Sequence, residues 1–226
     1  MGLIERSVAD IVHLMAGLID GWTGPEERSD VPFRWGIPAG LEDTILTQEV
    51  HETFVQARFR LNETVSAGIQ IRLPRWEPGN ARRAGLLLAE HDGVQHWPRW
   101  LQTTDNAASE HLQSMLEFGR TASSERLQAA RERIEQSAQD LLGAFTEVDL
   151  LILPTTPQTP FKVTESVPSS QADLTALANF AGCPAISLPC PVPSGQSPVG
   201  LQLISAPGSD RRLLELAGTV ERCLLH

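Results

Sequence analysis

The feature that most constrains this chain is the run at residues 148–154, which is almost entirely apolar (VDLLILP). A strand with one solvated face alternates apolar and polar residues, and this run does not alternate, so it predicts a strand buried on both faces. Strands of this kind belong to sheets that helices cover on both sides. The run therefore predicts an α/β fold.

Further strand-like and helix-like segments alternate along the chain, which favours an α/β/α sandwich around a mixed sheet. Short apolar or alternating runs predict strands at residues 33–37, 68–73, 185–189 and 199–204. Helical spacing predicts helices at residues 8–19, 47–65, 173–181 and 209–225, and a mostly helical middle at 81–145 whose last helix carries a stripe from Leu127 to Phe145. Ser7 is the expected N-cap of the first helix. Asp92-Gly93 and Trp97-Pro98 are turn signals in the middle segment. The order strand, helix, strand over residues 33–73 predicts a parallel pair with a helical crossover.

Composition narrows the class of protein. With 226 residues and 41% hydrophobic side chains the chain is long enough for a buried core, and we treat residues 1–226 as one domain. The net charge of −10 disfavours binding to nucleic acid or to an anionic membrane. Three cysteines without a CxxC pair disfavour a disulfide scaffold and a zinc site. Charged side chains interrupt residues 1–18, so we expect no signal peptide there. We expect a cytoplasmic protein.

Four motifs occur in a recognisable order. They are GLIERSVAD at residues 2–10, DLLILPTTP at 149–157, TALANFAGCPAISLP at 175–189 and PVGLQLI at 198–204. In this order they resemble the amidase signature family, with two departures: Leu3 stands where the family usually has proline, and Ser205 where it has glycine. The resemblance implies that family's α/β/α sandwich and the hydrolysis of amide bonds, or release of ammonia for transfer, by a Ser–cis-Ser–Lys mechanism.

The catalytic residues that the resemblance implies are missing from the chain. Its one lysine, Lys162, stands in a polar loop, and its two Ser-Ser pairs, at residues 123–124 and 169–170, lack flanking glycines. We therefore expect a truncated, carboxyl-terminal portion of an amidase that forms an incomplete sandwich. We expect it to have no catalytic residue, no metal and no cofactor, and to be inactive alone. A non-catalytic binding or assembly module, or one chain of a split amidase, is the alternative. The expected partners are a small-molecule amide if the missing half completes the site, and a partner chain or a second copy.

Three polar residues are candidates for the wall of a substrate pocket. Thr155 and Thr156 directly follow the apolar run, and ligands collect at the carboxyl ends of strands in α/β sheets. Asn179 lies in the third motif. The alternative for all three is local capping of loops by their hydroxyl and amide groups.

Other polar clusters have simpler structural interpretations. In the cluster Glu90-His91-Asp92 and His96, the histidine spacing of five does not place both rings on one helical face, and Gly93 is expected to break the helix between them. A solvated helix end is therefore expected rather than a metal site. Cys183 and Cys190 flank a strand and are expected to be small buried hydrophobes. Gly195-Gln196-Ser197 lacks the second glycine of a nucleophile elbow, and Pro198 removes an oxyanion donor, so a turn is expected. The pairs at residues 82–83 and 211–212 are expected to be exposed helix charges.

Overall fold

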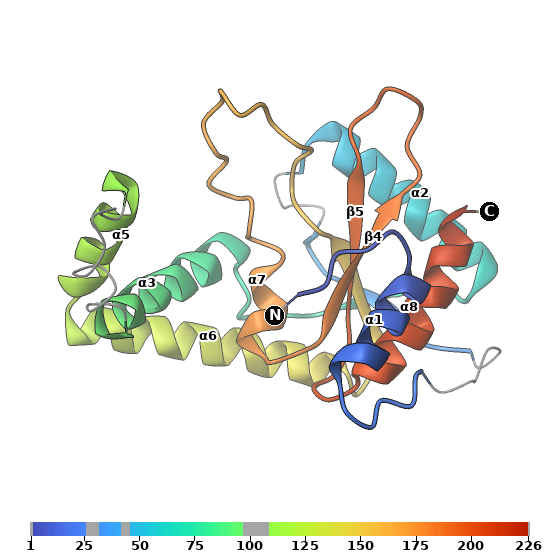
Figure 1. Ribbon diagram of the computed structural model, residues 1–226, viewed down its shortest axis with the longest axis horizontal. Helices are drawn as coiled ribbons and strands as arrows, with labels where there is room; N and C mark the ends of the chain where they lie inside the picture. Colours follow the sequence, from blue (N-terminus) through green and yellow to red (C-terminus); the bar gives the residue numbers. More distant parts are fainter. Residues whose placement is uncertain (1, 26–31, 42–45, 97–108, 226) are drawn as a thin grey trace.

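The computed structural model describes residues 2–25, 32–41, 46–96 and 109–225. A five-stranded mixed sheet crosses the centre of the molecule in the order β2-β1-β3-β5-β4 (Figure 1). The strands are β1 (Trp35–Pro38), β2 (Ile69–Ile71), β3 (Leu150–Pro154), β4 (Ala185–Cys190) and β5 (Val199–Ile204). β1 is parallel to β2 and to β3, and β5 is antiparallel to β3 and β4. The predicted mixed sheet and its parallel crossover pair are thus confirmed.

β3 occupies the middle of this sheet, as its composition requires. All five of its residues are buried, and four of them have no exposed surface. These four are Leu150, Leu151, Ile152 and Leu153. Burial of one large aliphatic side chain contributes about 1.5–3 kcal/mol, so the strand is a main source of stability.

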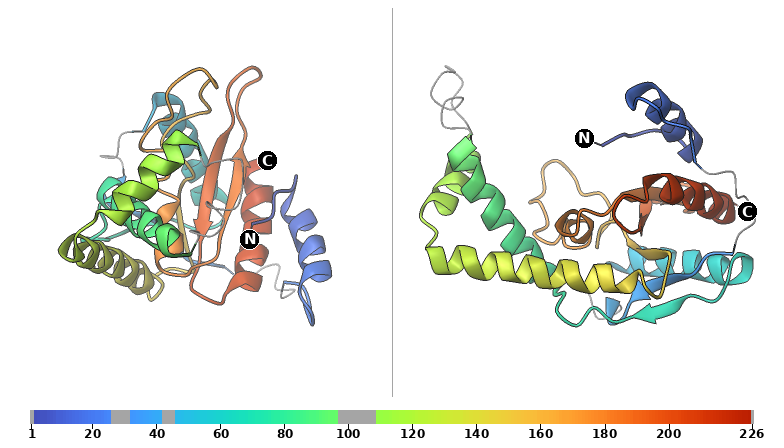
Figure 2. Two further views of the ribbon diagram at one scale, coloured as in Figure 1. Left: turned by 60° about the vertical axis from the view of Figure 1, so that its left-hand side comes forward. Right: turned by 90° about the horizontal axis from the view of Figure 1, so that it is seen from below.

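Helices cover both faces of the sheet, which confirms the predicted layers (Figure 2). On one face lie α2 (Gln48–Thr64) and α8 (Asp210–Leu225), and α1 (Val8–Leu18) packs against α8. The other face is covered by α7 (Ala176–Phe180) and its preceding segment, where the Gln202 side chain of β5 donates a hydrogen bond to the Leu174 carbonyl at 3.3 Å. No described helix is both long and apolar enough to cross a membrane.

Three helices form an arm that extends from the sheet (Figure 1). They are α3 (Pro78–His96), α5 (Glu110–Arg120) and α6 (Ser124–Ala144). The arm has a small core of its own, made of Ala84, Leu87, Leu127 and Ala130. α5 crosses α3 closely at Gly119, where an added Cβ would lie 2.5 Å from the α3 backbone.

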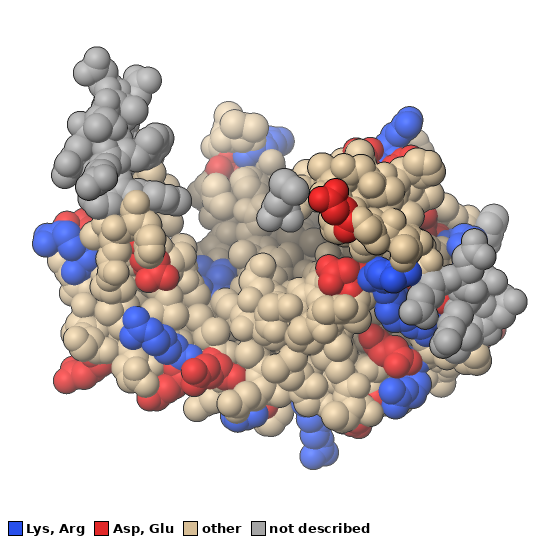
Figure 3. All heavy atoms as spheres, turned by 60° about the horizontal axis from the view of Figure 1, so that its bottom comes forward, with Lys and Arg blue, Asp and Glu red and all other residues tan. Residues whose placement is uncertain are grey.

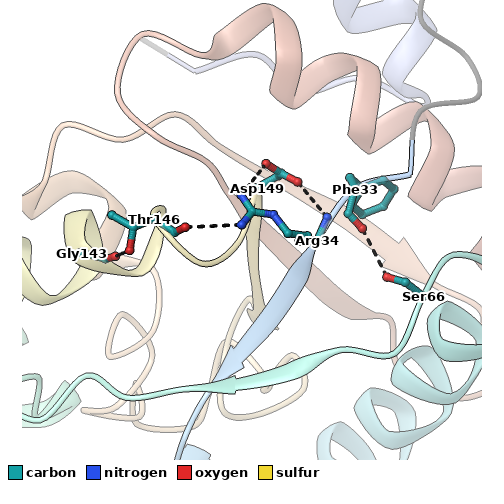
Figure 4. A network of polar contacts seen from close by, with 6 residues as sticks. All are labelled: Phe33, Arg34, Ser66, Gly143, Thr146 and Asp149. Atoms are coloured by element: carbon teal, nitrogen blue, oxygen red, sulfur yellow. Dashed lines mark hydrogen bonds and ion pairs between the residues drawn. The ribbon is translucent and has the colours of Figure 1, made fainter.

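A polar network fixes the register of β1 against β3 at the end of the sheet where β3 begins (Figure 4). The Asp149 carboxylate accepts a hydrogen bond from the Arg34 backbone N–H at 2.8 Å and pairs with its guanidinium at 3.4 Å. The guanidinium also donates to the Thr146 carbonyl at 3.4 Å, and the Ser66 hydroxyl donates to the Phe33 carbonyl at 3.3 Å. Asp149, the first residue of the second motif, therefore has a structural role far from the strand's carboxyl end.

The amino-terminal helix begins as the sequence predicts. The Ser7 hydroxyl accepts a hydrogen bond from the Asp10 backbone N–H at 3.1 Å, and the Glu221 carboxylate of α8 accepts one from the Val8 N–H at 3.1 Å. The predicted apolar stripe faces the core only in its first turns, because Leu18 and Ile19 are exposed.

The turn predicted at Asp92-Gly93 is wrong, since α3 continues to His96 with Gly93 buried inside it. A glycine in a helix costs about 1 kcal/mol relative to alanine, which tertiary packing outweighs here. Trp97-Pro98 lies outside the described residues.

Two charged residues of α3 are also less solvated than predicted. Arg82 is not an exposed charge: its guanidinium pairs with Asp173 at 2.6 Å, and both side chains are mostly buried. Glu90 does not lie at a solvated helix end, because only 8% of it is exposed. In both cases neighbouring segments cover a helix face that sequence alone assigns to solvent.

Candidate functional site

A pocket of about 550 Å³ lies where β3 ends, β4 ends and β5 begins. Strand direction explains its position, because β3 and β4 are both antiparallel to β5 and therefore end at the same edge of the sheet. Thr155 and Thr156 lie in its wall with the loop that follows them, opposite Ser187 of β4 and Gly200 of β5. We call this cavity the site pocket.

Two hydroxyl groups meet in the site pocket. The Thr155 and Ser187 side-chain oxygens are 2.6 Å apart, a short hydrogen bond that joins β3 to β4 across β5. Gly200 permits this contact, because a Cβ added there would lie 2.5 Å from the Thr155 hydroxyl and 2.7 Å from the Ser187 hydroxyl. The Thr155 backbone N–H donates to the Gly200 carbonyl at 2.8 Å, so the threonine is also fixed by its main chain.

The structure brings together two of the three predicted pocket residues. Thr156 lines the site pocket, and its hydroxyl also donates to the Gln158 carbonyl at 2.7 Å, which is the local capping considered as the alternative. Asn179 does not line the site pocket: its exposed side chain donates to the Thr175 carbonyl of its own helix at 3.3 Å.

Ser187 is the residue that sequence reasoning missed. It is the one polar residue within AISLPC of β4 and stands inside the third motif, and both facts were available signals. Its partnership with Thr155 depends on the strand order, which the sequence pattern does not specify.

The site pocket offers hydrogen-bonding groups but no activated nucleophile among the described residues. Glu5 is the only ionisable residue in its lining there. A serine or threonine hydroxyl attacks a carbonyl only when an adjacent base accepts its proton, and here the two hydroxyls bond to each other. The pair is therefore suited to orient a polar ligand. Lys162 is an exposed loop residue outside the lining, as predicted.

The cysteines near this region are not nucleophiles at neutral pH. Burial raises the pKa of the Cys183 and Cys190 thiols to about 11, with Arg60 opposing the rise at Cys190. Cys190 is a buried hydrophobe as predicted, and Cys183 is half-buried. Gly195 has a φ of +88° in an exposed turn, which agrees with the turn predicted there. Within the described part of the chain, no group of three or more acidic, histidine or cysteine residues is placed to hold a metal ion.

A second cavity of about 670 Å³ follows the outer edge of β4. Residues 2–8 and 183–189 line it together with parts of α1 and α8, and we call it the edge groove. Glu5, Ser187 and Pro189 border both the edge groove and the site pocket. Figure 3 shows that the molecule is also hollowed between the helical arm and the sheet-bearing body, with few charged side chains in the hollow.

Comparison with known proteins identifies the family. The family model "Amidase" matches residues 11–214. The A subunit of the glutamyl-tRNA(Gln) amidotransferase of Thermodesulfovibrio yellowstonii is 27% identical over 98% of this chain and 54% of its own length. Its counterpart in Prochlorococcus marinus (strain MIT 9303) is 30% identical over 76% of this chain and 41% of its own length. The chain thus spans about half the length of these relatives.

Solved structures share the fold. A crystal structure described as an amidase superposes with a TM-score of 0.82 at 24% identity, covering 97% of this chain and 51% of the other. The A subunit of the Thermotoga maritima glutamyl-tRNA(Gln) amidotransferase gives a TM-score of 0.74 at 20% identity, with the same coverage. The motifs, the mixed sheet between helical layers and the family model agree, and the chain belongs to the Amidase family.

Proposed function

We propose that this chain forms the carboxyl-terminal part of an amide-hydrolysing enzyme and that residues outside it supply the nucleophile and the base. The observation that carries the proposal is the site pocket itself. It presents a fixed hydroxyl pair, from Thr155 and Ser187, at the carboxyl end of the central strand, while Glu5 is the only ionisable residue among its described lining. A pocket of this kind holds and orients a carbonyl or amide group but does not cleave it.

The edge of β4 is the proposed docking line for the catalytic part. Among the described strands, β4 pairs only with β5, so one row of its backbone groups is unpaired. An unpaired edge accepts a further strand through main-chain hydrogen bonds. The edge groove lies between β4 and residues 2–7 and provides the space for the added strand. In isolation, the same edge favours association of two copies.

Complementation tests this proposal directly. The chain is purified alone and also together with the amino-terminal half of the Thermodesulfovibrio relative, and release of 4-nitroaniline from 4-nitroacetanilide is measured. We expect no turnover by the chain alone and turnover by the mixture, reduced by Thr155→Val in the site pocket and unaffected by Gly143→Ala on the exposed side of α6. Amide hydrolysis by the chain alone, abolished by a substitution within it, would refute the proposal. An inert mixture whose parts bind each other favours a non-catalytic assembly module.

A narrower second candidate is release of ammonia from glutamine for transfer. It is favoured by the relatives named above, which belong to glutamyl-tRNA(Gln) amidotransferases. Ammonia release from free glutamine by the complemented mixture, at a higher kcat/KM than anilide cleavage, supports this candidate. A preference for the anilide contradicts it.

A further inference from the structure

A groove in the helical arm combines an apolar floor with arginines. It has a volume of about 480 Å³, within the range of small-molecule sites, and lies between α3, α6 and the end of α5. Leu87 and Phe118 contribute apolar surface, and Arg83, Arg126 and Arg133 contribute positive charge. None of these residues belongs to the site pocket, and we call this cavity the arm groove.

Helical spacing explains why these side chains converge. Arg83, Leu87 and Glu90 stand at intervals of four and three on α3, and Arg126 and Arg133 are seven apart on α6, so each set shares one helix face. α7 packs on a different face of α3, at Gly85, where an added Cβ would lie 2.6 Å from the Phe180 ring. The arm groove therefore faces away from the contact with α7.

The arginines of the arm groove are incompletely neutralised. Arg133 makes a loose pair with Glu77 at 3.6 Å, and both side chains are partly solvated. Arg83 donates to the neutral Asn80 amide, and the Arg126 guanidinium lies over the Phe118 ring, 4.9 Å from its centre. Within the described residues, neither Arg83 nor Arg126 has a carboxylate at ion-pair distance. In a chain with a net charge of −10, this is a local positive site.

Glu90 adds a buried polar group at the same place. It is only 8% exposed, and among the described residues its Oε2 atom has no hydrogen-bond partner. Burial raises the pKa of this carboxyl, and His111 of α5 opposes the rise. Buried polar groups without a partner are uncommon in folded proteins, and each requires an explanation. A polar group of a ligand in the arm groove would give this carboxyl a partner.

We propose that the arm groove binds a small organic carboxylate with an apolar body, its charged group between Arg83 and Arg126 and its body against Leu87 and Phe118. Guanidinium groups bind carboxylates through paired, charge-assisted hydrogen bonds, which gives the anionic group its place. The apolar floor favours an aryl or branched alkyl body over a bare inorganic anion. This binding does not depend on the proposed amide hydrolysis.

Fluorescence titration of the 226-residue chain with 2-naphthoate tests the proposal. Two control probes separate its parts: 2-naphthamide has the same apolar body without the charge, and inorganic phosphate has charge without the apolar body. We expect saturable binding of 2-naphthoate at a Kd at least tenfold below those of the other two probes. Arg126→Gln should weaken it about tenfold or more, since it removes a charge-assisted contact. Arg131→Gln, an exposed residue on α6 outside the arm groove, should leave it unchanged.

Circular dichroism of each variant establishes that the arm remains folded. Equal binding of 2-naphthoate and 2-naphthamide, equal binding of phosphate, or an equal effect of the two arginine substitutions would overturn the proposal. Glu90→Gln keeps the size of the side chain and should change the Kd less than threefold, because Arg83 and Arg126 hold the ligand carboxylate. A tenfold tighter Kd in that variant would show that an ionised Glu90 repels the ligand, and would overturn the placement of the ligand carboxylate in the arm groove.

Discussion

Replacing Gly200 with alanine tests the packing on which the site pocket depends. The new Cβ would lie 2.5 Å from the Thr155 hydroxyl and 2.7 Å from the Ser187 hydroxyl, whereas ordinary van der Waals contact begins at 3.4 Å. Neither neighbour moves freely, because the Thr155 backbone is bonded to the Gly200 carbonyl and Ser187 lies within β4. Overpacking of this kind costs about 1–3 kcal/mol, and loss of the hydroxyl–hydroxyl bond adds about 1 kcal/mol.

The expected result is therefore a loss of about 2–4 kcal/mol in the free energy of unfolding, which for a chain of this length lowers Tm by roughly 5–15 °C. Urea unfolding followed by circular dichroism measures the free energy, and a thermal scan measures Tm. Gly143→Ala is the matched control, because an added Cβ there meets no atom within 4 Å and alanine favours the helix by about 1 kcal/mol.

A double-mutant cycle separates the hydroxyl contact from general strain. Thr155→Ala should cost about 1 kcal/mol in the wild-type chain but less, or nothing, in the Gly200→Ala chain, because the hydrogen bond has already been lost there. Equal stability of the Gly200→Ala and Gly143→Ala chains, or additive effects of the Gly200 and Thr155 substitutions, would refute the reasoning.

Three further predictions concern the arm, a partly exposed ion pair and the thiols. Gly119→Ala should destabilise the arm by about 3 kcal/mol, because the new Cβ would lie 2.5 Å from the α3 backbone. Hydrogen exchange should then accelerate in α5, and unchanged exchange would contradict the close crossing. Arg75→Ala should cost about 1–2 kcal/mol in urea unfolding, since it removes the half-exposed guanidinium from the buried Asp140 carboxylate while the backbone N–H of residue 75 still donates to it. No measurable cost would mean that water replaces the guanidinium. Alkylation of Cys183 and Cys190 by iodoacetamide at pH 8 should be about 100-fold slower in the folded chain than in guanidinium, because a pKa of about 11 instead of 9.0 leaves about 100-fold less thiolate, and equal rates would refute this.

The sheet was predictable wherever burial leaves a pattern in the sequence. The run at residues 148–154 predicts β3 because a strand covered on both faces excludes polar residues. The sequence pattern places the shorter strands to within a few residues. The strand predicted at residues 68–73 is longer than the observed β2, in which only Ile71 of three residues is buried. The sequence pattern does not contain the spatial order β3-β5-β4, because it depends on β5 pairing with β3, more than 40 residues earlier, as well as with the neighbouring β4.

The arm was the least predictable part, for a physical reason. Local propensity placed a turn at Gly93 and assigned Arg82 and Glu90 to solvent, whereas α3 is covered on several sides by α5, α6 and α7. Helix–helix contacts at Gly85 and Gly119 depend on the absence of a side chain, and sequence does not distinguish such a glycine from a flexible one. Tertiary burial therefore outweighs the local signals there.

The site pocket was half predictable, and its missing half shows how the two cavities are related. Thr155 was found because it follows a strand, whereas Ser187 enters the site only because β4 lies beyond β5. On β4 the residues Ala185, Ser187 and Pro189 are exposed and alternate with more buried ones, as the period of two requires. A strand added to the β4 edge would place its side chains about 5 Å from this row. Under the proposed docking, a polypeptide that pairs with β4 would approach the hydroxyl pair at the same time, and its assembly would complete the site pocket.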